Sequence, residues 1–172
     1  MRPVREGPPW RCLREKRMGR MAADGPDGMN GPDARVNDAT LRHVLNSVRT
    51  IALVGASAKP ERPAHMVQRF LQEKGYRVFP VNPGLAGGEL LGAPVFARLA
   101  EIPEPVDMVD IFRNSAAAGK VVDEALSLVP RPKVIWMQIG VINEEAAERA
   151  RAAGLTVIMN RCPKIEYARL FG

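Results

Sequence analysis

The sequence of 172 residues is poor in the residues that build disulfide scaffolds, metal centres and all-β cores. Its two cysteines, Cys12 and Cys162, lack metal-site spacing and cannot form a disulfide framework, so a reducing, cytoplasmic location is expected. Aromatic residues make up only 5%, and the apolar mass of Ala, Val, Leu and Ile suits helices packed on a parallel sheet. No apolar run approaches the roughly 20 residues of a membrane span, which predicts a soluble protein without a membrane partner.

Positive charge is concentrated at the amino terminus. The net charge is +6, but the first 20 residues hold seven Lys or Arg against two Glu, which leaves +1 for the rest. A basic stripe is therefore not evident in the remaining chain, and nucleic-acid binding is disfavoured. Residues 1–35, rich in Gly, Pro and Asp, predict a disordered basic tail before one domain over 36–172.

The nature of the amino-terminal segment has alternatives. No apolar segment follows the basic residues, so a secretory signal peptide is not expected. A mitochondrial presequence is a weaker alternative, because Pro and Gly interrupt the Arg-rich segment. A translation start at Met18, Met21 or Met29 is a third.

The stretch 50–60, TIALVGASAKP, organises the chain. Ile51–Val54 is an unbroken run of small or branched apolar residues, as expected for a strand covered on both faces. Gly55 ends this strand, and apolar residues then recur at helical spacing over 64–74. A turn of small residues before a helix lets an anion, usually phosphate, approach the helix amino terminus.

Strand and helix patterns alternate through the rest of the chain. Further strands are expected at 76–81, 106–112, 133–138 and 155–159, with a short edge strand near 93–96. Besides the helix over 64–74, helices are expected after Asn37 or Asp38, after Asn114 or Ser115, after Asn143 and over 163–171. Pro80 predicts that strand pairing stops or bulges near its position. The alternation predicts an α/β fold, a Rossmann-like, doubly wound and mostly parallel sheet in a single domain.

Small or polar residues follow every expected strand. Because the carboxyl ends of parallel strands meet at one edge, these segments predict a single ligand-binding rim built from 55–57, 82–83, 112–115, 138–140 and 160–162. The dinucleotide fingerprint and the Walker A motif are both absent. Asn82 stands where an NAD site has a carboxylate, so NAD is disfavoured.

Three stretches together carry a resemblance to a known family. They are residues 55–96, which begin GASAKPERPAHMV, residues 102–113, IPEPVDMVDIFR, and residues 134–167, which begin VIWMQIG. The chain resembles, over about residues 41–171, the small single-domain CoA-binding family, which is related to the nucleotide-binding domain of the succinyl-CoA synthetase α subunit. The resemblance implies a Rossmann-like domain, of the NAD(P)-binding superfamily scaffold, that holds coenzyme A or an acyl-CoA.

The resemblance also implies a role for each rim segment. The turn 55–57 would cradle the pyrophosphate, with Lys59 and Arg62 as candidates for the 3′-phosphate, and 81–83 would border the adenine. The segment 112–115 would meet phosphate or pantetheine, and 138–140 would line the pantetheine end. Ordinary loop charges, a plain turn and a structural arginine are the alternatives. The candidate cofactor-binding residues are Gly55, Ala56, Ser57, Lys59, Arg62, Val81, Asn82, Pro83, Phe112, Arg113, Ser115, Gln138, Gly140 and Cys162.

Cys162 is the most specific candidate. It follows a strand end, neighbours Arg161 and precedes a predicted helix amino terminus, which is the setting of a reactive cysteine. A mixed disulfide with the CoA thiol is the hypothesis, and a buried inert cysteine is the alternative.

Catalytic residues are not evident in the sequence. His43 and His65 lie off the predicted rim, and no carboxylate pair has acid–base spacing. We therefore expect a regulatory or carrier-like CoA-binding protein rather than an enzyme, with no metal site. The alternative is an NAD(P)-binding redox sensor or oxidoreductase, and a third hypothesis is partner binding through the basic tail.

Overall fold

The computed structural model describes residues 35–172. The tail predicted for residues 1–35 therefore lies, apart from Arg35, outside the described residues. In chain order the elements are α1 (Asp38–Ser47), β1 (Thr50–Val54), α2 (Pro63–Glu73), β2 (Arg77–Val81), β3 (Glu89–Leu90), β4 (Ala93–Pro94), a short 3₁₀ helix η2 (Leu99–Glu101), β5 (Met108–Ile111), α3 (Ser115–Leu126), β6 (Val134–Met137), α4 (Glu144–Ala152), β7 (Thr156–Ile158) and α5 (Pro163–Phe171).

Five parallel strands form the central sheet in the order β2-β1-β5-β6-β7. After β1 the chain moves outward to β2, and Phe96 then bridges Val81 in parallel beyond it. The chain next crosses back to β5 on the other side of β1, so the strand order reverses between β1 and β5. The predicted Rossmann-like parallel α/β fold in a single domain is confirmed.

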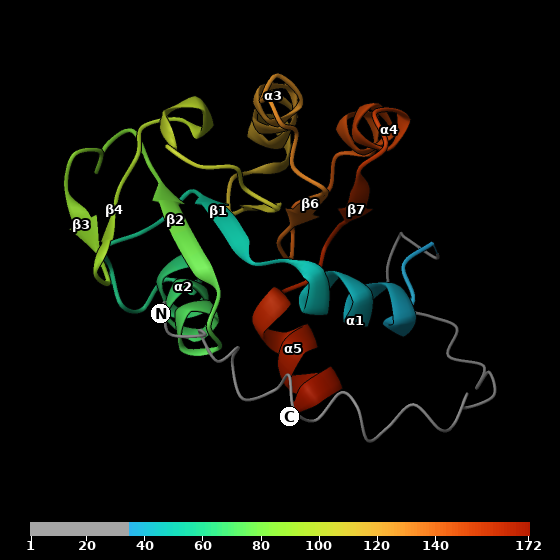
Figure 1. Cartoon of the computed structure of the whole chain (residues 1–172), viewed down its shortest axis with the longest axis horizontal. Helices are drawn as coiled ribbons and strands as arrows, with labels where there is room; N and C mark the ends of the chain where they lie inside the picture. The colour runs from blue at the N-terminus through green and yellow to red at the C-terminus, as the bar shows by residue number, and fades with distance from the viewer. Residues whose placement is uncertain (1–34) are drawn as a thin grey trace, which may run out of the picture. The chain divides into compact units, whose positions relative to one another are not determined.

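Helices cover both faces of this sheet (Figure 1). Alternate strand residues, such as Leu53 and Trp136, pack into a core with α1, α2 and α5, which we call the α2/α5 face. Their neighbours in the chain, such as Ala52 and Ile135, pack with α3 and α4 on the α3/α4 face. Because both faces are buried, the strands read as continuous apolar runs, and each large buried side chain contributes roughly 1.5–3 kcal/mol.

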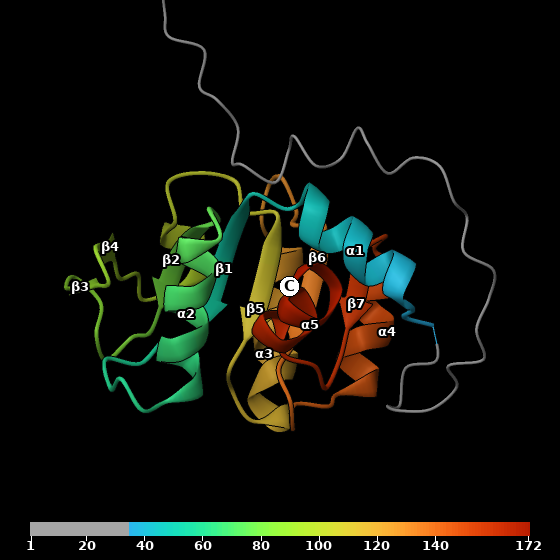
Figure 2. The ribbon, with the colours of Figure 1, turned by 90° about the horizontal axis from the view of Figure 1, so that it is seen from below.

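On the α2/α5 face, α5 lies over the sheet between α2 and α1 (Figure 2). Arg169 of α5 fixes one side of this arrangement, because its guanidinium bonds Asp38 of α1 at 2.6 Å and Glu166 at 2.6 Å. Edge-to-face contact between the rings of Phe70 of α2 and Tyr167 of α5, at 5.7 Å, fixes the other side. Helix α5 is thus held against α1 on one side and against α2 on the other.

Asparagine side chains cap the amino termini of α1, α3 and α4. The Oδ1 atoms of Asn37, Asn114 and Asn143 each accept a hydrogen bond from the backbone N–H three residues later, at 2.8–2.9 Å. Helices α2 and α5 instead begin with Pro63 and Pro163 and have no side-chain cap. These two helix starts therefore keep amides that no side chain of the described chain satisfies.

Pro80 does not interrupt β2, and that expectation was wrong. The parallel register continues with Pro80 opposite Leu53 and Val81 opposite Val54. The carbonyl of Pro80 accepts from the N–H of Phe96 at 3.0 Å, so its backbone polar positions face away from β1. The N–H that proline lacks would therefore not have bonded β1, and the ladder continues. The edge strand expected near 93–96 is a short hairpin of β3 and β4, followed by the bridge at Phe96.

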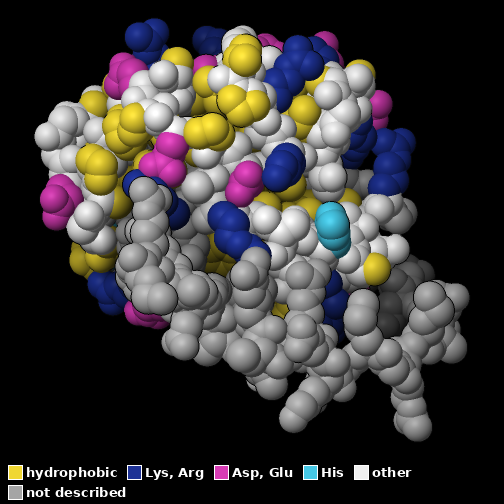
Figure 3. Space-filling model, in the orientation of Figure 1, with side chains coloured by type: hydrophobic (Ala, Val, Ile, Leu, Met, Phe, Trp, Pro, Cys, Tyr) yellow, Lys and Arg dark blue, Asp and Glu magenta, His cyan; other side chains and the backbone are white. Residues whose placement is uncertain are grey.

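On the face seen in Figure 3, Lys and Arg side chains of the described residues are interspersed with acidic and apolar ones rather than gathered in one stripe. None of the described helices has the length and hydropathy needed to cross a bilayer. Residues 35–172 also contain no cluster of three potential metal ligands.

Candidate functional site: a cavity between α2 and α5

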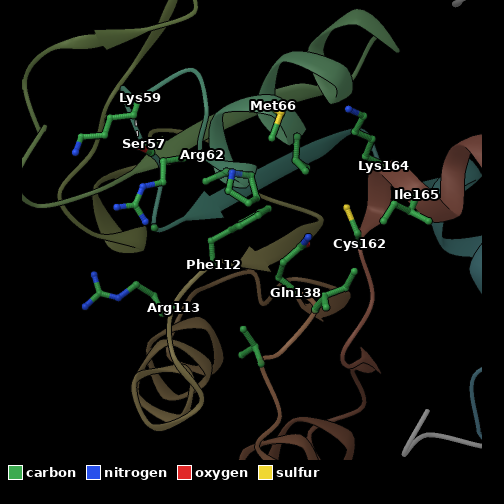
Figure 4. Close-up of a pocket in the computed structure, with 16 residues that line it drawn as sticks. Ser57, Lys59, Arg62, Met66, Phe112, Arg113, Gln138, Cys162, Lys164 and Ile165 are labelled. Atoms are coloured by element: carbon green, nitrogen blue, oxygen red, sulfur yellow. Dashed lines mark hydrogen bonds between the residues drawn. The ribbon is translucent and has the colours of Figure 1, made fainter. Parts of the chain in front are cut away.

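A cavity of about 740 Å³ opens at the carboxyl edge of the sheet, on the α2/α5 face (Figure 4). It lies at the end of β1 and β5, where the strand order reverses, which is the usual ligand position in such sheets. Its wall comes from the β1–α2 loop, the start of α2, the ends of β5 and β6, and the start of α5. The lining residues are Gly55, Ser57, Lys59, Arg62, Pro63, Ala64, Met66, Val67, Phe112, Arg113, Gln138, Ile139, Val141, Cys162, Lys164 and Ile165.

The glycine turn after β1 is packed directly against β5. Gly55 has a φ of +92°, and a Cβ at this position would lie 2.6 Å from the carbonyl oxygen of Phe112. The N–H groups of Gly55 and Ala56 both donate to the carbonyl of Val81, at 2.9 and 3.3 Å. Their amides are therefore used within the fold, whereas the amides of Ser57 and Ala58 have no partner among the described residues. The free donors of the turn thus lie two and three residues beyond the glycine.

Two side chains hold the turn in this position. Asn82 donates from Nδ2 to the carbonyl of Ala56 at 2.8 Å and accepts at Oδ1 from Gly84 N–H at 2.8 Å. His65 Nδ1 lies 3.0 Å from the carbonyl oxygen of Ser57, so Nδ1 carries the proton of this hydrogen bond. Asn82 and His65 therefore hold the turn in position through its carbonyl groups, although neither side chain lines the cavity.

Four cationic side chains line the cavity: Lys59, Arg62, Arg113 and Lys164. Lys164 lies 5.8 Å from the ring centroid of Phe70, and none of the four makes a salt bridge within residues 35–172. The lining contains no Asp or Glu to offset them. The electrostatic field of the cavity therefore favours an anionic ligand.

Gln138 brings an unsatisfied polar group to the wall. Its side chain follows β6, is 8% exposed, and its Oε1 has no hydrogen-bond partner among the described residues. A buried acceptor left unpaired costs about 1–3 kcal/mol, so a ligand N–H reaching it would be favoured. Around it the wall is apolar, and Met66, Ile139 and Ile165 remain 42%, 57% and 54% exposed. This end of the cavity suits an apolar arm that carries an amide.

Cys162 lies at the start of α5 and lines the same cavity. It is a free thiol, 6% exposed, at the N-cap position of a helix with no side-chain cap. The guanidinium of Arg161 is directed to the carboxylate of Glu166, 3.4 Å away. The backbone carbonyl of Arg161 accepts a hydrogen bond from Trp136 Nε1 at 2.9 Å. The cationic neighbour expected beside the thiol is thus paired elsewhere, whereas Lys164 shares the cavity wall with it.

The residues predicted from the sequence divide into two groups. One group does not line the cavity, although several of its members support the rim: Ser115 Oγ accepts from Ile142 N–H at 3.0 Å, and Gly140 N–H donates to Asn160 Oδ1 at 2.8 Å. This group consists of Ala56, Val81, Asn82, Pro83, Ser115 and Gly140. The structure brings the others together in the wall: Gly55, Ser57, Lys59, Arg62, Phe112, Arg113, Gln138 and Cys162.

Sequence reasoning missed most of the apolar wall and one buried carboxyl. The apolar wall residues come mainly from the first turns of α2 and α5. The sequence carried a signal for both helix starts, because each has a proline at its first position and no capping residue before it. Asp110, in β5 between Leu53 and Trp136, is fully buried and its carboxylate oxygens have no partner. Burial raises the pKa of this carboxyl well above its ordinary value.

Comparison with known proteins extends this description. The model of the CoA binding domain family matches residues 49–168. The protein YneT of Bacillus subtilis is 38% identical over 130 residues, which is 76% of this chain and 93% of that protein. The α subunit of the ADP-forming acetate–CoA ligase I of Pyrococcus furiosus is 29% identical over 131 residues, 66% of this chain but 27% of the subunit.

Solved structures show the same fold. Protein ID.343 from Thermus thermophilus is 43% identical, with a TM-score of 0.75 over 79% of this chain and 100% of that chain. A protein from Pyrococcus horikoshii OT3 is 37% identical, with a TM-score of 0.78 over 84% of this chain and 99% of that one. Since the family match covers well over half of the chain, including α2, the first turns of α5 and every strand that ends at the cavity, the chain belongs to the CoA binding domain family.

Proposed function

We propose that the chain binds coenzyme A, or an acyl-CoA, in the cavity between α2 and α5. The observation that carries the proposal is the coincidence, in one cavity, of unpaired backbone amides, four cations without a carboxylate, and an apolar chamber. CoA has the matching parts, since its nucleotide end carries phosphates and its other end is a flexible arm with amides and a thiol. Membership of the CoA binding domain family supports the same ligand.

The diphosphate would meet the β1–α2 turn. The amides of Ser57 and Ala58 are unpaired there, and the uncapped start of α2 adds a positive dipole end. Lys59 and Arg62 would supply fixed charge to the 3′-phosphate. The adenine would lie outside the cavity lining, near the segment 81–83, whose Asn82 bonds the turn. In this arrangement Gly55 serves by its size, because any side chain would displace the turn from Phe112.

The pantetheine arm would run from the turn into the chamber between α2 and α5. Phe112 and Gln138 form its floor, and the orphaned Oε1 of Gln138 would accept a hydrogen bond from an amide of the arm. Met66, Ile139 and Ile165 would lose solvent-exposed apolar surface on binding, which favours the complex by about 25 cal/mol per Å².

A carrier-like or regulatory role is part of the proposal. The described residues of the cavity wall offer cations, one amide and one thiol, but no carboxylate or imidazole that could move a proton. Such a wall can hold a thioester or thiol without a carboxylate or imidazole beside it. A catalytic relative, such as the acetate–CoA ligase subunit, contains much more chain than the part this protein matches.

Isothermal titration of the purified full-length protein tests the proposal. We expect saturable binding of CoA and acetyl-CoA at one site per chain, and no comparable binding of NADP. Dephospho-CoA, which lacks the 3′-phosphate, is expected to bind more weakly than CoA. Tight binding of NADP with indifference to CoA would contradict the proposal and support the redox-sensor or oxidoreductase alternative.

A further inference from the structure

The thiol of Cys162 is enclosed by the cavity. Among residues 35–172 it is the single cysteine, it is 6% exposed, and its surroundings belong to the cavity wall. Figure 4 shows its sulfur directed into the space between α2 and α5. A reagent can therefore reach this sulfur from the cavity more readily than from bulk solvent.

A second group at the same place points to a ligand. Gln138 is more than nine-tenths buried, its Oε1 lacks a partner, and its side chain reaches into the same space as Cys162 (Figure 4). Unpaired buried polar atoms are uncommon in folded proteins, and one in a cavity wall marks where a ligand group completes the hydrogen bonding. The thiol and this acceptor thus lie in the wall of one binding chamber rather than in a closed core.

We propose that Cys162 is a modification site that exchanges with the disulfide of a CoA molecule bound in the cavity. The inference rests on the proposed function, because the nucleotide end of the ligand must first be held at the β1–α2 turn. With the phosphates held there, the arm enters the chamber and its terminal sulfur is delivered towards Cys162. The ligand class is the disulfide form of CoA, either CoA disulfide or a mixed disulfide of CoA with a small thiol.

The exchange balances without any further oxidant. Cys162 loses its proton to solvent, and its sulfur attacks the sulfur of the bound CoA moiety. A new Sγ–S bond forms as the ligand's own S–S bond breaks, and the departing thiolate takes up a proton. One disulfide is consumed and one is formed, so the product is a chain carrying one CoA through Cys162 and one free thiol.

The position of Cys162 favours this step in two ways. It lies at the uncapped amino terminus of α5, and Lys164 lines the same wall, so positive potential surrounds the reacting sulfur atoms. Anchoring of the nucleotide end also makes the reaction effectively intramolecular, which raises its rate above that of an unanchored disulfide. The structure therefore assigns selectivity for CoA-containing disulfides rather than general thiol reactivity.

Intact mass spectrometry under non-reducing conditions tests the inference on the full chain. The reduced protein is incubated in parallel with CoA disulfide and with glutathione disulfide, and peptide mapping locates any adduct. We expect one CoA per chain on Cys162, reversed by dithiothreitol, with a rate at least about 10-fold higher for CoA disulfide than for glutathione disulfide. Cys12→Ser is the matched control and should keep the adduct, whereas Cys162→Ser should lose it.

The outcomes separate this inference from the proposed function. If calorimetry detects CoA binding to the reduced wild-type chain but mapping finds no CoA on Cys162, the inference is wrong and the proposed function stands. Equal rates with both disulfides would mean an ordinary accessible thiol and would also overturn the inference. If the reduced chain binds no CoA, both proposals fail. Peptide mapping of the wild-type chain tests the inference even if Cys162→Ser does not fold.

Discussion

The two faces of the sheet differ in how far the chain satisfies its own polar groups. On the α3/α4 face, both helices begin with a capping asparagine, Asn114 and Asn143, and pack through small apolar residues. On the α2/α5 face, the two helices that wall the cavity have no side-chain cap. The buried side-chain atoms without a partner among the described residues also belong to this face, namely those of Gln68, Asp110 and Gln138.

This difference agrees with the proposed binding of a ligand on the α2/α5 face. Capping side chains and paired acceptors each stabilise a fold by about 1 kcal/mol, and the α3/α4 face has them. The cavity side of the α2/α5 face lacks them at the positions that a phosphate and an amide-bearing arm would satisfy. Binding sites are commonly less stable than the scaffold that holds them.

The largest effect is expected for Gly55→Ala. A methyl group there would meet the Phe112 carbonyl at 2.6 Å on a backbone with φ of +92°, so we expect a loss of about 2–4 kcal/mol in unfolding free energy and loss of CoA binding. Gly154→Ala is the matched control, because its φ is +89° with no atom within 4 Å of the added carbon. Denaturant titration should give about 1 kcal/mol for the control. Equal losses of unfolding free energy in the two variants would contradict a close contact between Gly55 and the carbonyl of Phe112.

Removal of the cations at the start of α2 is expected to weaken binding next most strongly. The double variant Lys59→Ala/Arg62→Ala should raise the Kd for CoA by about 10- to 100-fold, because both side chains line the cavity without a salt bridge. Dephospho-CoA should be affected less. Arg69→Ala/Lys120→Ala removes the same charge away from the cavity and should change the Kd little. A similar loss in both double variants would mean that net charge, not this site, governs binding.

The buried carboxyl of Asp110 should make stability depend on pH. Burial raises its folded-state pKa, so its favourable contribution is complete below the unfolded pKa and is lost as pH rises through the folded pKa. Asp110→Asn should therefore gain stability relative to wild type as pH rises from acid to neutral.

Asp107 provides a control of opposite sign. Burial alone would raise its pKa, but hydrogen bonds from the backbone N–H groups of Arg49 and Thr50 outweigh burial and lower the pKa. The contribution of Asp107 is therefore present above its unfolded pKa and is lost as pH falls through its folded pKa. Unfolding free energies measured from acid to neutral pH should show Asp107→Asn becoming relatively less stable as pH rises. The same trend for both variants would contradict the assignment.

The smallest effect is expected for a cap on the α3/α4 face. Asn143→Ala removes the acceptor for Ala146 N–H and the Nδ2 donor to the carbonyl of Ser115, and should cost about 1–2 kcal/mol of stability, while the Kd for CoA stays within about twofold. Asn143→Gly should recover only the part of this loss that belongs to the cap, because glycine is tolerated at N-cap positions but cannot donate to the carbonyl of Ser115. A large change in Kd would mean that the two faces are coupled and that the comparison between them is too simple.

The fold was predictable from the sequence because its signals are local. Apolar runs marked every strand of the main sheet, and the asparagines marked three helix starts through side chains that bond only three residues away. Pro80 was misjudged because its effect depends on which way its carbonyl faces in the sheet. That direction follows from β2 lying at the edge beside Phe96, which no local pattern reveals.

The site was predictable only in part, for a similar reason. The loops after the strands were identifiable because parallel strands bring their ends together. The apolar wall depends on how α5 returns over the sheet beside α2, and Asn82 belongs to the support of the turn because its amide reaches back to Ala56. Which amides of the turn stay free, those of Ser57 and Ala58, also follows from the pairing of Gly55 with Val81 and not from composition.

Amide chemical shifts measured during a CoA titration test the central claim most directly. With ¹⁵N-labelled protein, we expect the N–H resonances of Ser57 and Ala58 to shift most on adding CoA, followed by those at the start of α2. Adenosine 3′,5′-bisphosphate, which lacks the diphosphate and the arm, should shift them much less. Saturable binding that leaves the Ser57 and Ala58 amides unchanged would contradict the account.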